Sequence, residues 1–323
     1  MLPRVFKNFV FAVGALGAAA AMAFPSKPIQ LMVPYPAGGA SDVTARAAQG
    51  PISNTLGVPV VVENLGGANG MLAANKVLAA PSDGYYMFQG SPNELILAGL
   101  TNKAVRYQPT DFEMLHPVAV SPYVVLVRAG LPVKNVDELL ELARTSATPL
   151  SYGTGGMGSQ HHLVVEDFGR RAKAKLTHVP YRGGAPVLTD LVGGQLDFTI
   201  FPMQSNYVDF QREGKLRILA TLEPKRLAVL PDVPSVEESM HLKGFHYTVW
   251  TAYLVKKGTP QEYREKLRES VVKSLDDPGM RRVMDAQGKL MFSPMSLKEA
   301  EAFYQREVRS INELFRASGF RPE

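Results

Sequence analysis

The chain contains no cysteine among its 323 residues. This absence excludes a disulfide framework, a thiolate nucleophile, a cysteine metal site and a lipid anchor on cysteine. A protein without disulfides depends on its hydrophobic core for stability. A chain of this length can bury such a core, and the length favours two lobes over one.

Long apolar runs are scarce as well. One uncharged apolar run, Phe9–Ala20, follows Arg4 and Lys7 and precedes Ala21-Met22-Ala23. The run is short for a membrane span, and this order of features is typical of a secretory signal peptide, with cleavage between Ala23 and Phe24. We therefore expect a mature protein that is soluble in the periplasm and not lipid-anchored. The alternative is an N-terminal anchor that is not cleaved.

The charge imbalance is small. The chain has 35 Lys and Arg against 30 Asp and Glu, a net charge of +5, to which Arg4 and Lys7 of the signal peptide contribute. No basic run is interleaved with aromatic residues, so we expect no nucleic-acid partner. A slight positive excess is compatible with anionic ligands.

Short apolar segments alternate with helical segments along most of the chain. Strands are predicted at 29–34, 58–63 and 85–90, with helices between them, and the alternation recurs from residue 123 to residue 214. This order predicts an α/β fold in which mostly parallel sheets are flanked by helices.

The helical C-terminal part is predicted to return to the first unit, which gives a discontinuous lobe. Residues 1–23 form the signal peptide, 24–122 and 220–323 form lobe 1, and 123–219 form lobe 2. Two crossing strands are expected near Val118–Tyr123 and Leu216–Thr221, because a hinge between lobes needs a double crossing.

Four loops of small residues run from a strand into a helix. Such loops lie at the carboxyl edge of a parallel sheet, where ligands bind, and a helix start offers unpaired N–H groups and a partial positive charge. Two loops from each lobe could hold a small anion between them. The alternative is that these are ordinary turns whose serines, Ser41, Ser91, Ser159 and Ser205, act only as N-caps. The loops are Pro34–Asp42, Gly90–Asn93, Gly153–Ser159 and Phe201–Ser205.

The third loop matches a dinucleotide-binding pattern, Gly153-x-Gly155-x-x-Gly158. The acidic residue that this fold needs about twenty residues later is missing, and His178 stands there instead. No Gly-x-Ser-x-Gly elbow, His-Glu-x-x-His motif or Walker loop is present. We therefore expect no catalytic residue, no cofactor and no metal. An exported enzyme acting on a small carboxylate and a scaffold protein remain the alternatives.

Two adjacent histidines and a basic triplet complete the candidates. His161 and His162 cannot share a metal ion, because neighbouring helical residues point about 100° apart. We expect His162 to face the cleft and His161 to be exposed. Arg281, Arg282 and Lys289 are expected to form a solvated surface.

A series of motifs runs through the mature chain in a fixed order. They are Val33-Pro34-Tyr35-Pro36-Ala37-Gly38-Gly39 with Asp42 and Arg46; Glu63-Asn64 with Gly67 and Gly70; Asp83-Gly84-Tyr85; Gly158-Ser159-x-x-His162-Leu163; Val179-Pro180-Tyr181-Arg182-Gly183; Asp190–Asp197; Gly214-Lys215-Leu216-Arg217; Leu230–Ser235; and Gly258-Thr259-Pro260. With these motifs the chain resembles the substrate-binding receptors of tripartite tricarboxylate transporters, the Bug family.

The resemblance implies a type II periplasmic binding-protein fold. It also implies that organic carboxylates are held largely by backbone N–H groups and water and are passed to a two-subunit membrane permease. We expect a monomer that performs no chemistry. Asp42 has an alternative role as a dipole-compensating acid, and Asp197 as a structural one. The ligand-binding residues implied are Tyr35, Ala37, Gly38, Gly39, Asp42, Ser91, Gly155, Gly156, Gly158, Ser159 and His162. Tyr35 and Ala37 depart from the family, which usually has Phe and Pro there.

Overall fold

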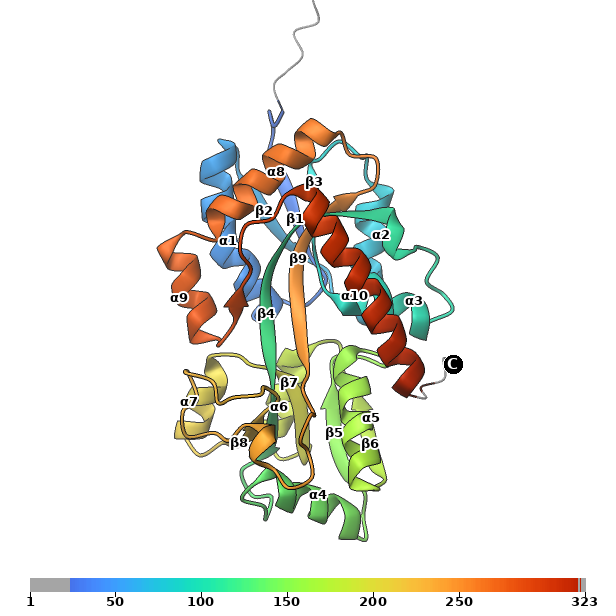
Figure 1. Ribbon diagram of the computed structural model, residues 1–323, viewed down its shortest axis with the longest axis vertical. Coiled ribbons are helices and arrows are strands. Elements are labelled where there is room, and N and C mark those ends of the chain that lie inside the picture. The colour runs from blue at the N-terminus through green and yellow to red at the C-terminus, as the bar shows by residue number, and fades with distance from the viewer. Residues whose placement is uncertain (1–23, 319, 321–323) are drawn as a thin grey trace, which may run out of the picture.

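The computed structural model describes residues 24–318 and 320, so the predicted signal peptide lies outside the described residues. Two lobes lie end to end along the long axis of the molecule, and β4 and β9 run from one to the other (Figure 1). Within the described part of the chain, no helix is both long and apolar enough to cross a membrane.

Lobe 1 is built on a mixed sheet. β1 (Ile29–Val33) pairs in parallel with β2 (Val60–Asn64) and β3 (Tyr86–Gly90), and β9 (Thr248–Lys256) and β4 (Phe112–Arg128) continue the sheet in antiparallel pairing. Three helices pack on one face: α1 (Ala40–Leu56), α8 (Gln261–Ser274) and α9 (Pro278–Ala286). Two pack on the other: α2 (Met71–Ala79) and α10 (Leu297–Ser318). The lobe also contains a π-helical turn at Asn93–Leu97, α3 (Ala98–Thr101) and β10 (Leu290–Met291).

Lobe 2 repeats this plan. β5 (Leu150–Thr154) pairs in parallel with β6 (Leu176–Pro180) and β7 (Phe198–Pro202), and the second half of β4 pairs antiparallel with β7 and with β8 (Leu216–Thr221). The helices of this lobe are α4 (Val136–Thr145), α5 (Gln160–Ala172), α6 (Gly184–Val192) and α7 (Asn206–Arg212). The two-lobe α/β architecture predicted from the sequence is confirmed.

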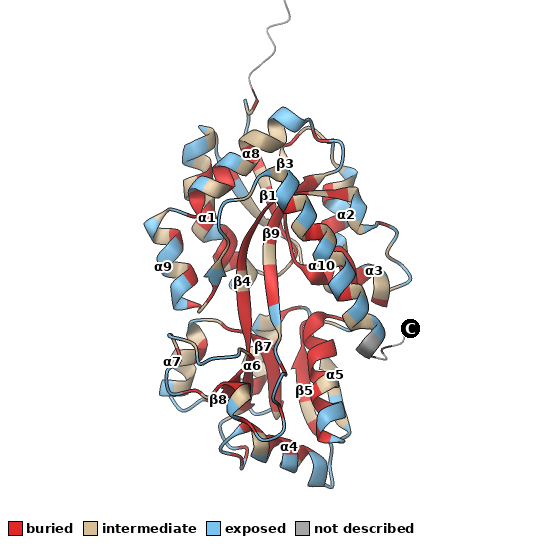
Figure 2. Cartoon of the chain, in the orientation of Figure 1, coloured by how far each residue is buried: buried red, intermediate tan, exposed pale blue. Residues whose placement is uncertain are grey.

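The core explains why the strands are continuous apolar runs rather than alternating ones. Along β4, Tyr123, Val125 and Val127 point into one core cluster of lobe 2, while Val124 and Leu126 point into the cluster on the opposite face. Successive side chains of a strand point to opposite faces, so a sheet covered on both sides needs apolar residues at every position. The central strands are accordingly buried along most of their length, whereas the edge strands β2 and β6 are partly exposed (Figure 2).

The return connection between the lobes differs from the prediction. Leu216–Thr221 was expected to cross back to lobe 1, but this strand is β8 and pairs with the lobe 2 half of β4. The segment after it also stays in lobe 2, since Leu222, Val236 and Phe245 complete that lobe's core. The crossing back is made where the chain enters β9, about thirty residues later than expected. The apolar residues of this segment gave no sign of which lobe they would cover.

Candidate functional site

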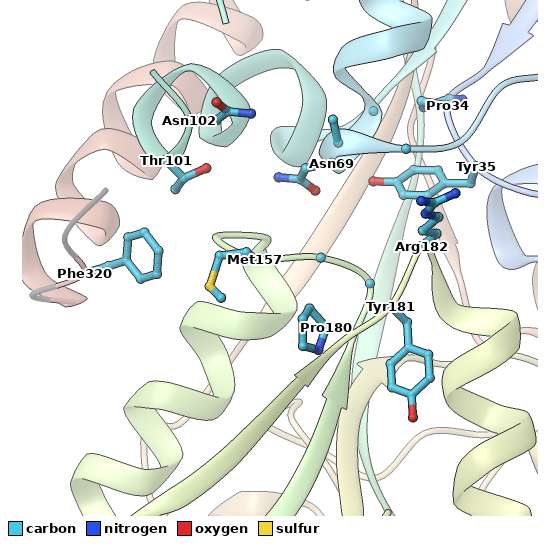
Figure 3. A pocket seen from close by; sticks show the side chains of 15 residues that line it. Pro34, Tyr35, Asn69, Thr101, Asn102, Met157, Pro180, Tyr181, Arg182 and Phe320 are labelled. Atoms are coloured by element: carbon cyan, nitrogen blue, oxygen red, sulfur yellow. The ribbon is translucent and has the colours of Figure 1, made fainter. Parts of the chain in front are cut away.

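Two cavities lie side by side at the junction of the lobes and share Tyr35 and Gly155. The first has a volume of about 70 Å³ and lies between the starts of α1 and α6, and we call it the α1–α6 cavity. The second has a volume of about 400 Å³ and is lined by Arg182, Asn69 and Phe320 among others, and we call it the Arg182 cavity (Figure 3).

The first predicted loop forms one wall of the α1–α6 cavity. Gly39, Ala40 and Ser41 line it, and the N-cap of α1 is Gly39 rather than Ser41. No side chain caps this helix, so its first N–H groups keep their hydrogen-bonding capacity. Ala37 and Gly38 are exposed and do not line either cavity.

Asp42 supports the loop and does not line the cavity. Its Oδ2 accepts hydrogen bonds from the backbone N–H of Gly38 and from Nε of Arg46, each at 2.9 Å. Burial alone would raise the pKa of Asp42, but the hydrogen bonds from Arg46 and Gly38 outweigh burial and lower it. The negative charge of Asp42 is therefore paired with Arg46 and held against the N–H of Gly38.

A buried network joins the first and second loops. The hydroxyl of Tyr35 donates to Oε2 of Glu94 at 3.0 Å, and Nδ2 of Asn93 donates to the same hydroxyl at 3.1 Å. Ser91, which lines the cavity, donates its Oγ proton to Oε2 of Glu94 at 3.0 Å. Burial raises the pKa of Glu94 to about 7. Glu94 was missed in the sequence, and Asn93, the last residue of the second predicted loop, was not named as a site residue. A polar residue in a helical turn gives no sign that it will be buried.

The third loop contains both residues that line a cavity and residues that support the loop. Gly155 lines both cavities and Gly156 lines the Arg182 cavity. Ser159 is the N-cap of α5: its Oγ accepts from the N–H of His162 and donates to the carbonyl of Gly156 at 2.7 Å. Gly158 donates its N–H to Nδ1 of His162 at 3.0 Å. Ser159 therefore caps α5 and lines neither cavity, as expected for an ordinary N-cap residue.

The prediction for the two histidines is wrong in two respects, because His161 rather than His162 lines the cavity and neither is exposed. His161 lines the α1–α6 cavity, stacked on Phe201 with ring centroids 4.4 Å apart, and it is buried rather than exposed. Its burial lowers the pKa to about 3, so the ring is neutral at physiological pH. His162 instead stacks on His178 at 3.9 Å and lies 3.6 Å from Glu166. Which of two adjacent residues faces a cleft depends on how the helix is rotated against its lobe.

The opposite wall of the α1–α6 cavity comes from a loop that was not among the four. Gly183, Gly184 and Ala185 line it at the start of α6, and this helix also has no side-chain cap. A signal was available, because a glycine pair follows the predicted strand that ends at Pro180. Two uncapped helix starts from different lobes thus meet at one cavity.

The prediction that Lys289 lies on the solvated surface is wrong. Arg281 and Arg282 are exposed, but Lys289 is only 4% exposed and lines the α1–α6 cavity. The sequence offered no sign of this burial, because it depends on the turn between α9 and β10. Gln204, from the predicted fourth loop, and Thr251 also line the cavity, although neither was named as a ligand-binding residue.

The lobes touch one another around the cavities. Oδ1 of Asn93 in lobe 1 accepts the backbone N–H of Gln160 in lobe 2 at 2.7 Å. A Cβ atom added to Gly183 would lie 3.0 Å from Cδ of Pro36 in lobe 1. These contacts are those of a closed arrangement, in which a small ligand would be enclosed from both sides.

A family model described as tripartite tricarboxylate transporter family receptor matches residues 44–320. The chain belongs to this receptor family. It is a family of transporter receptors, so the chain is a binding protein rather than an enzyme.

Solved structures of relatives agree with this assignment. The periplasmic binding protein BugD is 30% identical and has a TM-score of 0.86, covering 93% of this chain and 100% of BugD. MatC from Rhodopseudomonas palustris with bound malate is 28% identical with a TM-score of 0.84, covering 90% and 100%. Rpa4515 of R. palustris with adipate is 28% identical with a TM-score of 0.86, covering 93% and 100%. The predicted family and the type II binding-protein fold are confirmed.

Proposed function

We propose that this receptor is exported to the periplasm, binds a small organic carboxylate in the α1–α6 cavity as a monomer, and delivers it to a two-subunit membrane permease of the tripartite tricarboxylate type. One observation carries the proposal: the uncapped starts of α1 and α6 come from opposite lobes and line the same cavity.

The physical reason is the charge at a helix start. Unpaired N–H groups and the helix dipole favour an anion there, and Gly39, Gly183 and Gly184 let a ligand approach the backbone closely. A carboxylate held by both helix starts would link the lobes, so binding would favour the closed arrangement. The malate bound to MatC and the adipate with Rpa4515 support small dicarboxylates as the ligand class.

The proposed ligand contacts keep part of the predicted set and change the rest. Tyr35, Gly39, Ser91 and Gly155 remain proposed ligand-binding residues, joined by Ser41, His161, Gly184 and Gln204. Gly156 lines only the Arg182 cavity and is not among them. Asp42, Gly158, Ser159 and His162 are proposed to hold the loops in place instead of touching the ligand.

A melting-shift screen tests the proposal. The panel contains aliphatic acids (malate, succinate, adipate), amino acids (aspartate, glutamate) and aromatic acids (benzoate, phthalate), with glucose and calcium chloride as negative controls. A ligand that binds only the folded state stabilises it by about 2.7 kcal/mol at a hundredfold excess over Kd, which raises Tm by roughly 5 °C for a chain of this size. The acid should be recovered unchanged. Stabilisation by glucose or calcium and by none of the acids would refute the proposed ligand class.

A further inference from the structure

Lys289 is a buried cation without an anionic partner. Its Nζ donates to Oγ1 of Thr44 at 2.6 Å and to the carbonyl oxygen of Ala40 at 3.4 Å, and both acceptors are neutral. Among the described residues, no carboxylate lies within ion-pair distance of Lys289, although 17 ion pairs are found elsewhere. The side chain lines the α1–α6 cavity and is 4% exposed.

The backbone holds this side chain in place. Gly288 adopts a left-handed conformation (φ +61°) at the end of α9, and the N–H of Lys289 donates to the carbonyl of Met284 at 3.0 Å. The next two residues, β10, pair with β4. The side chain therefore starts from a fixed turn and reaches the N-terminal end of α1, where it contacts Ala40 and Thr44.

This position is electrostatically unfavourable in the absence of a ligand. A buried ammonium without a counter-charge loses its hydration and gains little in return, and burial lowers the pKa of Lys289 to about 7. The start of α1 beside it carries a partial positive charge of its own, which repels a second cation. An anion between the two would relieve both costs.

We propose that Lys289 is the counter-charge for one carboxylate of the ligand, which binds between Nζ and the N–H groups at the start of α1. The inference rests on the proposed function and adds a charged anchor to a site otherwise made of backbone and neutral groups. It makes the α1 end of the cavity selective for an ionised end group over an amide or an alcohol of the same shape, because only the ionised group neutralises the ammonium.

The proton balance of binding follows from this contact. Above pH 7 most of the unliganded protein has neutral Lys289, and a bound carboxylate favours the charged form, so binding takes up a proton. Affinity should fall as pH rises above about 7, by up to about tenfold per pH unit, until the pKa of the bound state is passed. Below about pH 7 the lysine of the unliganded protein is already charged, so affinity should no longer change with pH.

Other titratable groups around the cavity must be separated from this effect. His161 faces it from α5 with a pKa lowered by burial to about 3, and Tyr35 has a pKa raised well above its ordinary value, so neither titrates near neutrality. Asp42 in α1 has a lowered pKa and stays ionised. Glu94, behind Ser91, has a pKa raised to about 7 and could also take up a proton. Replacing Lys289 alone therefore assigns the proton.

The test compares Lys289→Met with Lys298→Met. Methionine keeps the length and apolar character of the stem, and Lys298 is an exposed residue nine positions away whose replacement controls for the loss of one positive charge. The probe is the acid with the largest melting shift in the screen above. Its Kd and the number of protons taken up are measured by isothermal titration calorimetry at pH 6, 7 and 8, in two buffers of different ionisation enthalpy.

We expect Lys289→Met to weaken binding about 10- to 100-fold at pH 7, the loss of a hydrogen bond to a charged group, and Lys298→Met to leave Kd unchanged. Wild type should take up close to one proton per ligand at pH 8, and Lys289→Met clearly less. Circular dichroism and Tm without ligand establish that the variant folds. Should it not fold, Lys289→Gln replaces it in both measurements, Kd and proton uptake.

The outcomes separate the two proposals. If no acid stabilises wild type, the proposed function fails and this inference fails with it. If acids stabilise wild type but Lys289→Met binds equally tightly with equal proton uptake, the proposed function stands and the role of Lys289 is refuted.

Discussion

Replacing Gly158 by alanine should weaken ligand binding by hindering the approach of the two lobes. Gly158 lies at the start of α5 in lobe 2 and packs against Thr101 in lobe 1. A Cβ atom added to Gly158 would lie 2.4 Å from Cβ, 2.5 Å from Cγ2 and 2.6 Å from Oγ1 of Thr101. Real Cβ atoms do not approach other atoms so closely, so the closed arrangement would have to shift.

Two costs must be separated in this variant. Gly158 has φ +69°, and an alanine in this conformation costs about 1–2 kcal/mol in the open and closed states alike. The overlap with Thr101 arises only on closure and adds about 1–3 kcal/mol, which weakens binding roughly 5- to 150-fold. Gly214 has the same φ of +69° and no atom within 4 Å of an added Cβ, so Gly214→Ala carries the first cost without the second.

The assay measures Kd by calorimetry and the radius of gyration by small-angle X-ray scattering, for wild type, both alanine variants and Gly158→Ala/Thr101→Gly. We expect Gly214→Ala to lower Tm but to keep the wild-type Kd. Gly158→Ala should bind more weakly and be more extended, and removal of the Thr101 side chain should restore part of the affinity. Equal Kd values for the two alanine variants would refute the argument that this contact belongs to closure.

Two further predictions concern single side chains. His161→Ala should weaken ligand binding with little loss of stability. His162→Ala should instead lower the free energy of unfolding by about 1–2 kcal/mol, because it removes the acceptor for the N–H of Gly158 and the stack on His178. Calorimetry of ligand binding and urea unfolding distinguish the two effects, and the opposite pattern would contradict the assigned roles. Asp197→Ala should lower the free energy of unfolding, measured in urea, by about 2–3 kcal/mol and leave Kd unchanged. Asp197 lies outside both cavities and accepts hydrogen bonds from Arg128 at 3.0 Å and from the N–H and Oγ of Ser151 at 2.8 and 3.0 Å. A changed Kd with intact stability would show that Asp197 acts on the ligand instead.

The features predicted correctly from the sequence are those with local signals. Strand-to-helix turns with small residues identified Gly39, Ser91 and Gly155, which line the α1–α6 cavity. Alternation of apolar and amphipathic segments gave the α/β fold and its two lobes. Both signals depend on residues close together in the chain, where backbone preference and periodicity operate.

The features predicted wrongly depend on contacts between distant segments. Lys289 appears as one of three basic residues, yet the turn at Gly288 directs it inward while Arg281 and Arg282 remain outside. The prediction that β8 crosses between the lobes is wrong, because the sequence of a strand does not specify which strand it pairs with. The choice between His161 and His162 likewise depends on the rotation of α5 in its lobe.

The ribbon formed by β4 and β9 joins the lobes and also touches the cavity, through Ser121 in β4 and through Val249 and Thr251 in β9. These two strands are therefore both the connection between the lobes and part of the cavity wall. A molecule bound in the cavity would touch the same backbone that sets how the lobes are placed relative to one another. Its presence would then act directly on that placement, with no relay through other parts of the protein.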